Sequence, residues 1–167
     1  MAKSAGFNGL YLVGHALFAN EVQKIIELGF DTVNIVALGD VKRSVRLAIL
    51  HLPTMVKYLL GRSPLVYNYR QAIRLFNRSI MSREDVVPTI LPNWDHSPRS
   101  GKRAFILHNS TPEGFKEHVE AIKRIVEKKQ NQVVMLKSWN EWGEGNYIEP
   151  DARWNRSYLN VLKEMLQ

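Results

Sequence analysis

The sequence predicts an α/β fold with a mostly parallel sheet. Strand-like and helix-like runs alternate through the whole 167-residue chain, as they do in βα units. A hydrophobic content of 45% over this length is enough for one substantial core but short for two. We therefore expect a single domain over residues 1–167, without internal repeats or an interdomain linker.

The first βαβ unit is predicted near the N-terminus. Leu10–Val13 is a short apolar run typical of a buried strand. A helix is expected from Asn20 to Gly29, because glycine commonly caps a helix at its carboxyl end. The apolar and β-branched run 30–37 then predicts a second strand.

A long helical pattern follows over residues 41–60, where apolar side chains recur at helical spacing. Pro53 is expected to kink or split this helix, and Gly61 to end it. Residues 65–67 predict a short strand, and residues 69–80 a basic helix.

The second half continues the alternation. Residues 86–91 form an apolar run, but Pro88 argues against a central strand because proline cannot donate a ladder hydrogen bond. A capping hydroxyl followed by Pro112 predicts a helix that extends to about Lys129. This helix leads into the apolar run 133–137, and a last amphipathic helix is expected over 157–166.

Two carboxylates follow the predicted strand 133–137 directly. Glu141 and Glu144 lie three residues apart, beside two glycines and the indoles of Trp139 and Trp142. Paired carboxylates can divide the acid and base work of glycosidic bond cleavage, and aromatic faces suit a sugar ring. Two acids at this spacing also occur on ordinary solvated surface, and their separation cannot be predicted from the sequence.

A second polar segment, 92–99, also follows an apolar run. It contains Trp94, Asp95, His96 and Arg99, and the alternative interpretation is a turn in which Asp95 pairs with Arg99. Two further candidates stand at comparable strand ends, His15 and the segment 67–69, although a lone histidine there is more often structural.

Several classes of function are excluded. The chain has no cysteine, so disulfides and thiolate chemistry are ruled out. No residues have metal-ligand spacing, and neither a P-loop nor a serine-hydrolase elbow is present, so we expect no metal and no cofactor. No apolar run has the length of a transmembrane helix or the pattern of a signal peptide, and we expect a cytoplasmic protein.

The net charge of +7 is concentrated in one region. Residues 41–103 hold 12 Lys and Arg against 3 Asp and Glu, while the remainder is slightly acidic. This region is either a solvated surface or a docking face for an anionic glycan, a membrane or nucleic acid. No nucleic-acid motif is present, so a specific nucleic-acid partner is not expected.

Three segments together resemble one family. The sequences Trp-Asp-His-Ser-Pro-Arg, Ser-Thr-Pro-Glu-Gly-Phe and Trp-Asn-Glu-Trp-Gly-Glu-Gly-Asn-Tyr-Ile-Glu-Pro-Asp occupy residues 94–99, 110–115 and 139–151. In order and spacing they resemble the bacterial WbsX glycosyltransferase-like family, which is related to glycoside hydrolase family 99. The similarity runs from residue 5 to the C-terminus.

This resemblance implies a role in O-antigen, lipopolysaccharide or other surface polysaccharide metabolism. The catalytic acids of the family's motif fall on Glu141 and Glu144. In the hydrolase relatives, which retain configuration at α-mannosidic linkages, the first acts as a base on the sugar 2-hydroxyl and the second as acid/base at the leaving oxygen. The substrate-binding positions would be Trp94, Asp95, Arg99, Trp139, Asn140, Trp142, Tyr147 and Glu149. Gly143 departs from the histidine of the hydrolases, which leaves transfer and hydrolysis both open.

The resemblance also implies a TIM-like (β/α)8 barrel, of which this chain would be the C-terminal part, since such barrels take about 250 residues. The missing strands would come from a second copy in a homodimer or from a separate N-terminal half. The substrate would be a carbohydrate, such as a mannose-type glycan. The alternatives are a noncatalytic carbohydrate-binding or assembly module, or an inactive fragment.

Overall fold

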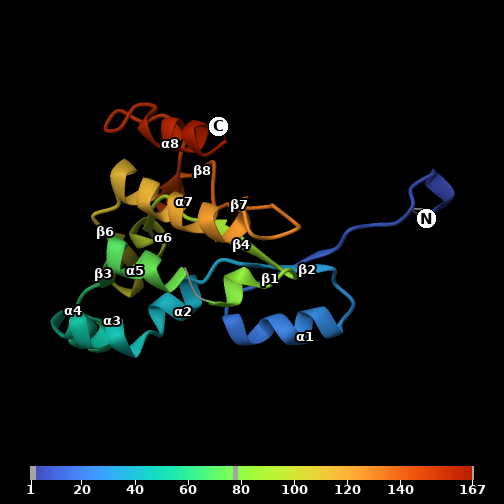
Figure 1. The fold of residues 1–167 in the computed structure, drawn as a ribbon. Helices are drawn as coiled ribbons and strands as arrows, with labels where there is room; N and C mark the ends of the chain where they lie inside the picture. Colours follow the sequence, from blue (N-terminus) through green and yellow to red (C-terminus); the bar gives the residue numbers. More distant parts are fainter. Residues whose placement is uncertain (1–2, 77–78, 167) are drawn as a thin grey trace.

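A curled, four-stranded parallel sheet forms the centre of the molecule (Figure 1). The computed structural model describes residues 3–76 and 79–166. The strand order is β1-β2-β4-β7, and each neighbouring pair is parallel. The α/β class with a mostly parallel sheet is thus confirmed. The four strands are β1 (Val13–Ala16), β2 (Thr32–Ile35), β4 (Val86–Ile90) and β7 (Met135–Leu136).

A second sheet has three strands in the order β3-β6-β5. Strands β3 and β6 are parallel, whereas β5 runs antiparallel to β6, with Trp94 opposite Leu107. Because β5 begins four residues after β4 ends, the linking segment joins the two sheets. The bounds are Leu65–Asn68 for β3, Trp94–Asp95 for β5 and Phe105–His108 for β6.

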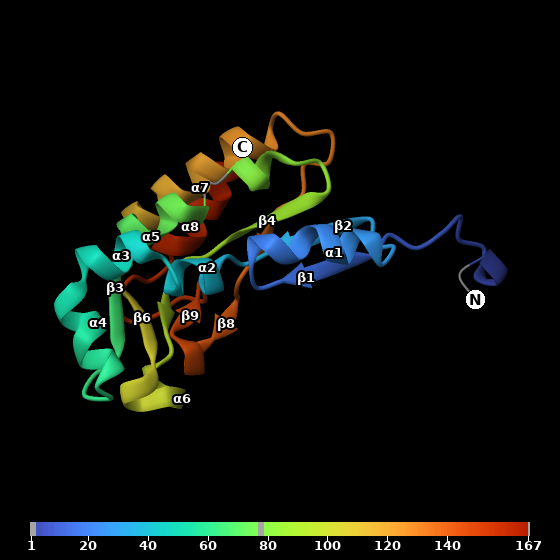
Figure 2. The same ribbon diagram turned by 90° about the horizontal axis from the view of Figure 1, so that it is seen from below.

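Helices connect the strands and cover the sheets (Figures 1 and 2). The best-capped is α7, where Thr111 Oγ1 accepts a hydrogen bond from the backbone N–H of Gly114 at 3.2 Å and Pro112 occupies the first turn. The cap predicted from the sequence is therefore confirmed. The helices are α1 (Val22–Glu27), α2 (Leu38–Lys42), α3 (Val45–Leu50), α4 (Leu52–Leu59), α5 (Tyr69–Phe76), α6 (Ser97–Ser100), α7 (Pro112–Val126) and α8 (Ser157–Met165).

Four expectations about the elements need correction. The first strand begins at Val13, because pairing with β2 starts there. The predicted helix 41–60 is three helices: the split expected at Pro53 is confirmed, since Pro53 lies in the first turn of α4, but a further helix starts after Ser44, whose hydroxyl accepts from Leu47 N–H. Strand β4 is central despite Pro88, since its ladder with β7 begins only one residue later. Strand β6 was not predicted.

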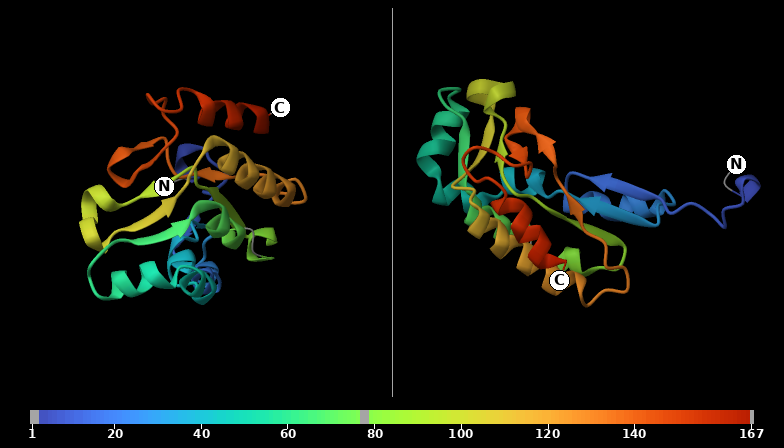
Figure 3. Two further views of the ribbon diagram at one scale, coloured as in Figure 1. Left: turned by 90° about the vertical axis from the view of Figure 1, so that its left-hand side faces the viewer. Right: turned by 90° about the horizontal axis from the view of Figure 1, so that it is seen from above.

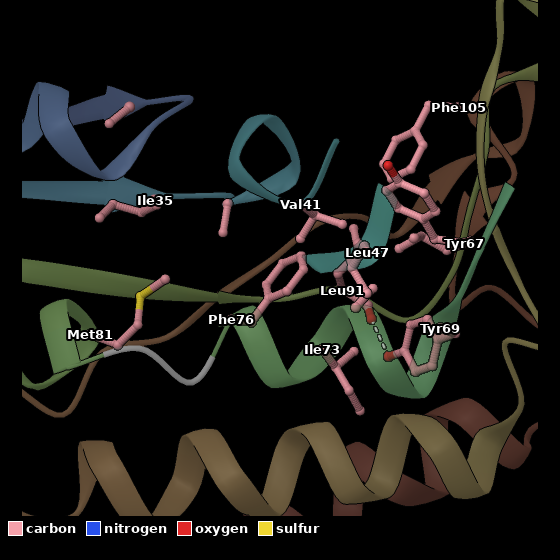
Figure 4. Packing of buried hydrophobic residues seen from close by; sticks show 14 of the residues in the cluster. Ile35, Val41, Leu47, Tyr67, Tyr69, Ile73, Phe76, Met81, Leu91 and Phe105 are labelled. Carbon is pink, nitrogen blue, oxygen red and sulfur yellow. Dashed lines mark hydrogen bonds between the residues drawn. The ribbon is translucent and has the colours of Figure 1, made fainter. Parts of the chain in front are cut away.

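The largest hydrophobic cluster lies between the two sheets and the helices α2, α3 and α5 (Figure 4). Its aromatic members include Tyr67, Tyr69, Phe76 and Phe105. The hydroxyl of Tyr69 donates to the backbone oxygen of Leu91 at 2.5 Å, and complete burial holds the pKa of this phenol well above its usual value. The segment after β4, from which the second polar motif emerges, is therefore fixed to the core.

The chain before β1 runs away from the sheets as an extended segment (Figures 2 and 3). Its apolar side chains are largely exposed, including Phe7 at 65% and Leu10 at 70%. Among the described residues, none of the helices combines the length and the hydrophobicity needed to cross a bilayer.

Candidate functional site

The carboxyl ends of the four central strands border a cleft. Because these strands are parallel, the residues that follow them share one edge of the sheet. The cleft has a volume of about 480 Å³. It is lined by residues from β1, from the segments after β2 and β7, from β5 and from the glutamate motif, among them His15, Leu17, Val36, Trp94, Lys137 and Glu144.

A tight hairpin carries the two glutamates. Strand β8 (Asn140–Glu141) pairs antiparallel with β9 (Asn146–Tyr147). A single 3-10 turn over Trp142–Glu144 joins them and ends at Gly145, whose φ of +49° lies in the left-handed region that glycine adopts without strain. Both glutamates therefore belong to one short hairpin, Glu141 at the end of β8 and Glu144 in the turn.

Arg99 connects the two carboxylates. This residue belongs to α6, and its Nη1 lies 3.2 Å from Glu144 Oε1 while its Nη2 lies 3.3 Å from Glu141 Oε2. Since one guanidinium contacts both groups, these two oxygens are less than about 9 Å apart, which does not exceed the largest separations used for glycosidic bond cleavage. The structure thus brings together residues from both motifs singled out in the sequence.

Asp95 does not pair with Arg99, which corrects the alternative interpretation of segment 92–99. Its Oδ1 accepts a hydrogen bond from the backbone N–H of Ser97 at 2.8 Å, at the start of α6. Asp95 instead borders a second cavity of about 310 Å³, together with Tyr147 and Trp154.

The two glutamates occupy different surroundings. The side chain of Glu144 is 16% exposed, and that of Glu141 is 49% exposed. Two further basic groups approach Glu144: Lys137 Nζ lies 3.5 Å from its Oε2, and His96 Nε2 lies 3.9 Å from its Oε1. Glu144 is therefore the better-enclosed carboxylate, with three basic neighbours, while Glu141 contacts Arg99 from the solvent side.

Aromatic rings surround the carboxylates. Trp94 stacks on His96, with ring centroids 5.8 Å apart and planes 5° from parallel, and Lys137 Nζ lies 5.4 Å from the centroid of the Trp94 ring. Trp94 thus holds two of the three basic groups that surround Glu144.

On the hairpin itself, Trp142 stacks on Tyr147 at 3.8 Å between centroids. The indole N–H of Trp142 donates to Glu149 Oε2 at 2.7 Å, so Glu149 orients this ring. The phenol of Tyr147 donates to Asp151, and burial together with this hydrogen bond raises its pKa. Trp139 is 49% exposed, and Asn140 is also exposed at the start of the hairpin.

Two asparagines that were not predicted fix the hairpin to the strands. Asn93 Oδ1 accepts from the N–H of Tyr147 at 2.8 Å, and its Nδ2 donates to the carbonyl of the same residue at 3.0 Å. The fully buried Asn146 donates to the backbone oxygens of Asn93 at 2.7 Å and Lys137 at 2.9 Å. The sequence indicates their role only in that each of the two polar motifs contains one of these asparagines.

The other strand-end candidates lie differently. His15 Nδ1 is 3.1 Å from Asn34 Oδ1, and His15 lines the cleft. Tyr67 and Tyr69 belong to the hydrophobic cluster, so they are core residues rather than site residues. Within residues 3–76 and 79–166, no three His, Asp or Glu side chains are grouped so that they could hold a metal ion.

Comparisons with known proteins agree with the motifs. The family described as Glycosyltransferase WbsX matches residues 1–162. The uncharacterized protein WxcX of Xanthomonas campestris pv. campestris, from two strains, is 30% identical over 108 residues. That alignment covers 60% of this chain and 15% of the relative's length. No solved structure gives a significant match.

Proposed function

We propose that this chain, which belongs to the WbsX glycosyltransferase family, acts on glycosidic bonds of a carbohydrate substrate through Glu141 and Glu144. The observation that carries the proposal is the pair of carboxylates joined by one guanidinium, at 3.2 and 3.3 Å, at the carboxyl edge of a parallel sheet. Paired carboxylates are the groups that glycosidic chemistry requires.

The roles follow the resemblance stated above. Glu141, on the solvent side, is the base toward the sugar 2-hydroxyl, and the better-enclosed Glu144 acts at the bridging oxygen. Arg99 holds both side chains in the absence of substrate. Trp94, Trp139 and Trp142 offer apolar faces to sugar rings, and a mannose-type glycan is the proposed substrate.

The finer architecture belongs to the same proposal. The curled sheet, with its site at the carboxyl ends, corresponds to part of a (β/α)8 barrel. Strands β1 and β7 are the edges of the sheet at which further strands would pair. Those strands would come from outside residues 1–167, for example from a second copy.

Isosteric substitutions test the catalytic proposal. Glu141→Gln and Glu144→Gln should each lower the turnover of α-mannoside oligosaccharides by about 10²- to 10⁴-fold, because each removes a proton-transfer group while keeping its shape. Binding of the same oligosaccharides, measured by calorimetry, should be retained. Glu164→Gln is the matched control, since Glu164 lies in α8 and pairs with Lys116.

Turnover that is equal in the two site variants and the control would contradict the proposal. A second candidate function, a noncatalytic carbohydrate-binding module, is favoured by the exposure of Trp139 and Trp142, at 49% and 47%. Exposed indole rings can bind sugars without catalysing a reaction. In that case the wild-type chain would bind the oligosaccharides without turnover, and Trp139→Ala would weaken binding.

A further inference from the structure

Helices α3 and α4 expose a row of aliphatic side chains. They lie at an outer edge of the molecule, beside β3 (Figures 1 and 2). Within α4, Leu52, Val56 and Leu59 follow one another at spacings of four and three residues, so they share one side of the helix. We define the α3–α4 face by six residues that are 45% to 74% exposed: Val45, Ile49, Leu52, Val56, Leu59 and Leu60.

The opposite side of α4 already faces the core. Met55 and Tyr58 pack against the main hydrophobic cluster, and Thr54 Oγ1 donates to the backbone oxygen of Val66 in β3 at 3.2 Å. The helix α4 is therefore apolar on two sides: one packs against the core, and the other is exposed. A helix with this pattern normally has apolar surroundings on both sides, and a contiguous exposed apolar patch typically marks an interaction surface.

The segment that contains this face carries charges of one sign. The sequence holds no Asp or Glu between residues 41 and 83. Exposed basic side chains occur among the aliphatic ones along these two helices and just after them, namely Arg46, Lys57 and Arg62. Among the residues that the structure describes, Arg46, Lys57 and Arg62 form no ion pair.

We propose that the α3–α4 face docks on the surface of an anionic phospholipid bilayer. The aliphatic side chains would enter the boundary between headgroups and acyl chains, and the basic side chains would remain at the level of the phosphates. The charge selects this partner, because an excess of Lys and Arg without any acid is complementary to a uniformly anionic surface. Nucleic acid fits less well, since the outward row is aliphatic and offers no aromatic ring for stacking on bases.

Co-sedimentation with large unilamellar vesicles tests the proposal. The full chain should sediment with vesicles of equal parts phosphatidylglycerol and phosphatidylcholine, and far less with phosphatidylcholine alone. Val56→Ser combined with Leu59→Ser should reduce partitioning by at least about tenfold, because both side chains lose their apolar contact. Arg46→Gln combined with Lys57→Gln should reduce it by about 25-fold, at about fivefold for each basic residue.

The matched control changes the same properties outside this face. Leu28→Ser combined with Lys128→Gln removes one exposed leucine and one exposed lysine, and partitioning should stay within about twofold of the wild type. Three results would overturn the proposal. One is equal binding to neutral and anionic vesicles, and another is salt-sensitive binding that the serine variant leaves unchanged. The third is a wild-type dimer that the serine variant converts to monomer while neither form binds vesicles.

Discussion

Gly143 and Gly145 flank Glu144, but a side chain at each position would meet different atoms. At Gly145, with a φ of +49°, a Cβ would lie 2.7 Å from the Cβ of Asp95 and 3.1 Å from its backbone N and O. At Gly143 it would lie 3.1 Å from Nε of Arg99, near the far end of a long side chain. A substitution at Gly145 therefore strains the backbone, whereas a substitution at Gly143 can be accommodated.

We predict that Gly145→Ala lowers the free energy of unfolding by about 2 to 4 kcal/mol, through left-handed strain and overpacking against Asp95. Gly143→Ala should cost less than about 1 kcal/mol, since Arg99 can move. Urea denaturation of both variants measures the difference. Equal losses would mean that the close approach of Gly145 to Asp95 does not determine the hairpin position.

Single residues in the site differ in how far the sequence could predict them. The grouping of Glu141 with Glu144 is local, so the spacing of the motif already indicated it. The contact of both with Arg99 is not local, because it depends on how α6 lies against the hairpin. The sequence suggested Asp95 as the partner of Arg99, and this was wrong because Asp95 instead accepts from the Ser97 N–H. Catalysis by the two glutamates stays a prediction.

Between elements, the side chain of Asn93 joins the segment after β4 to β9. It makes two hydrogen bonds with the backbone of Tyr147, at 2.8 and 3.0 Å. Asn93→Ala leaves both backbone groups without these partners, so we predict a loss of about 1 to 3 kcal/mol in the free energy of unfolding and weaker carbohydrate binding. Asn131→Ala is the control, since the side chain of Asn131 donates to the hydroxyl of the exposed Tyr11, and the substitution should cost less than about 0.5 kcal/mol. A similar loss in both variants would contradict this role for Asn93.

Elements with local signals were predicted better than elements that depend on pairing. The cap at Thr111 and the proline after it predicted the start of α7 correctly. The run Phe105–His108 is only four residues long, and it becomes a strand because β3 and β5 lie on either side of it. The same dependence on partners moved the first strand to Val13 and allowed Pro88 in a central strand. Long-range pairing, which the sequence pattern does not contain, decided these cases.

Across the whole molecule, α7 joins two hydrophobic clusters. Its Ile125 packs against both of them. From the same helix, His118 meets the ring of Phe76, with centroids 5.2 Å apart. His118 is fully buried, so water cannot solvate a charge on its ring. A charge on this ring would therefore be costly in the folded state, which links its protonation to unfolding.

Burial lowers the pKa of His118 to about 3 from its usual value of 6.5, so the unfolded chain binds the proton more tightly than the folded one. The contribution of the neutral ring to the free energy of unfolding is consequently complete above about pH 6.5. It is lost as the pH falls from there toward 3, at about 1.4 kcal/mol per pH unit. We predict that between pH 7 and pH 5 the wild type loses about 2 kcal/mol more than His118→Leu, which does not titrate at this position. Urea denaturation at both pH values measures this difference. The exposed His108, replaced by glutamine, provides the control and should follow the wild type. If the wild type and His118→Leu lost stability in parallel, protonation of His118 would not be coupled to unfolding.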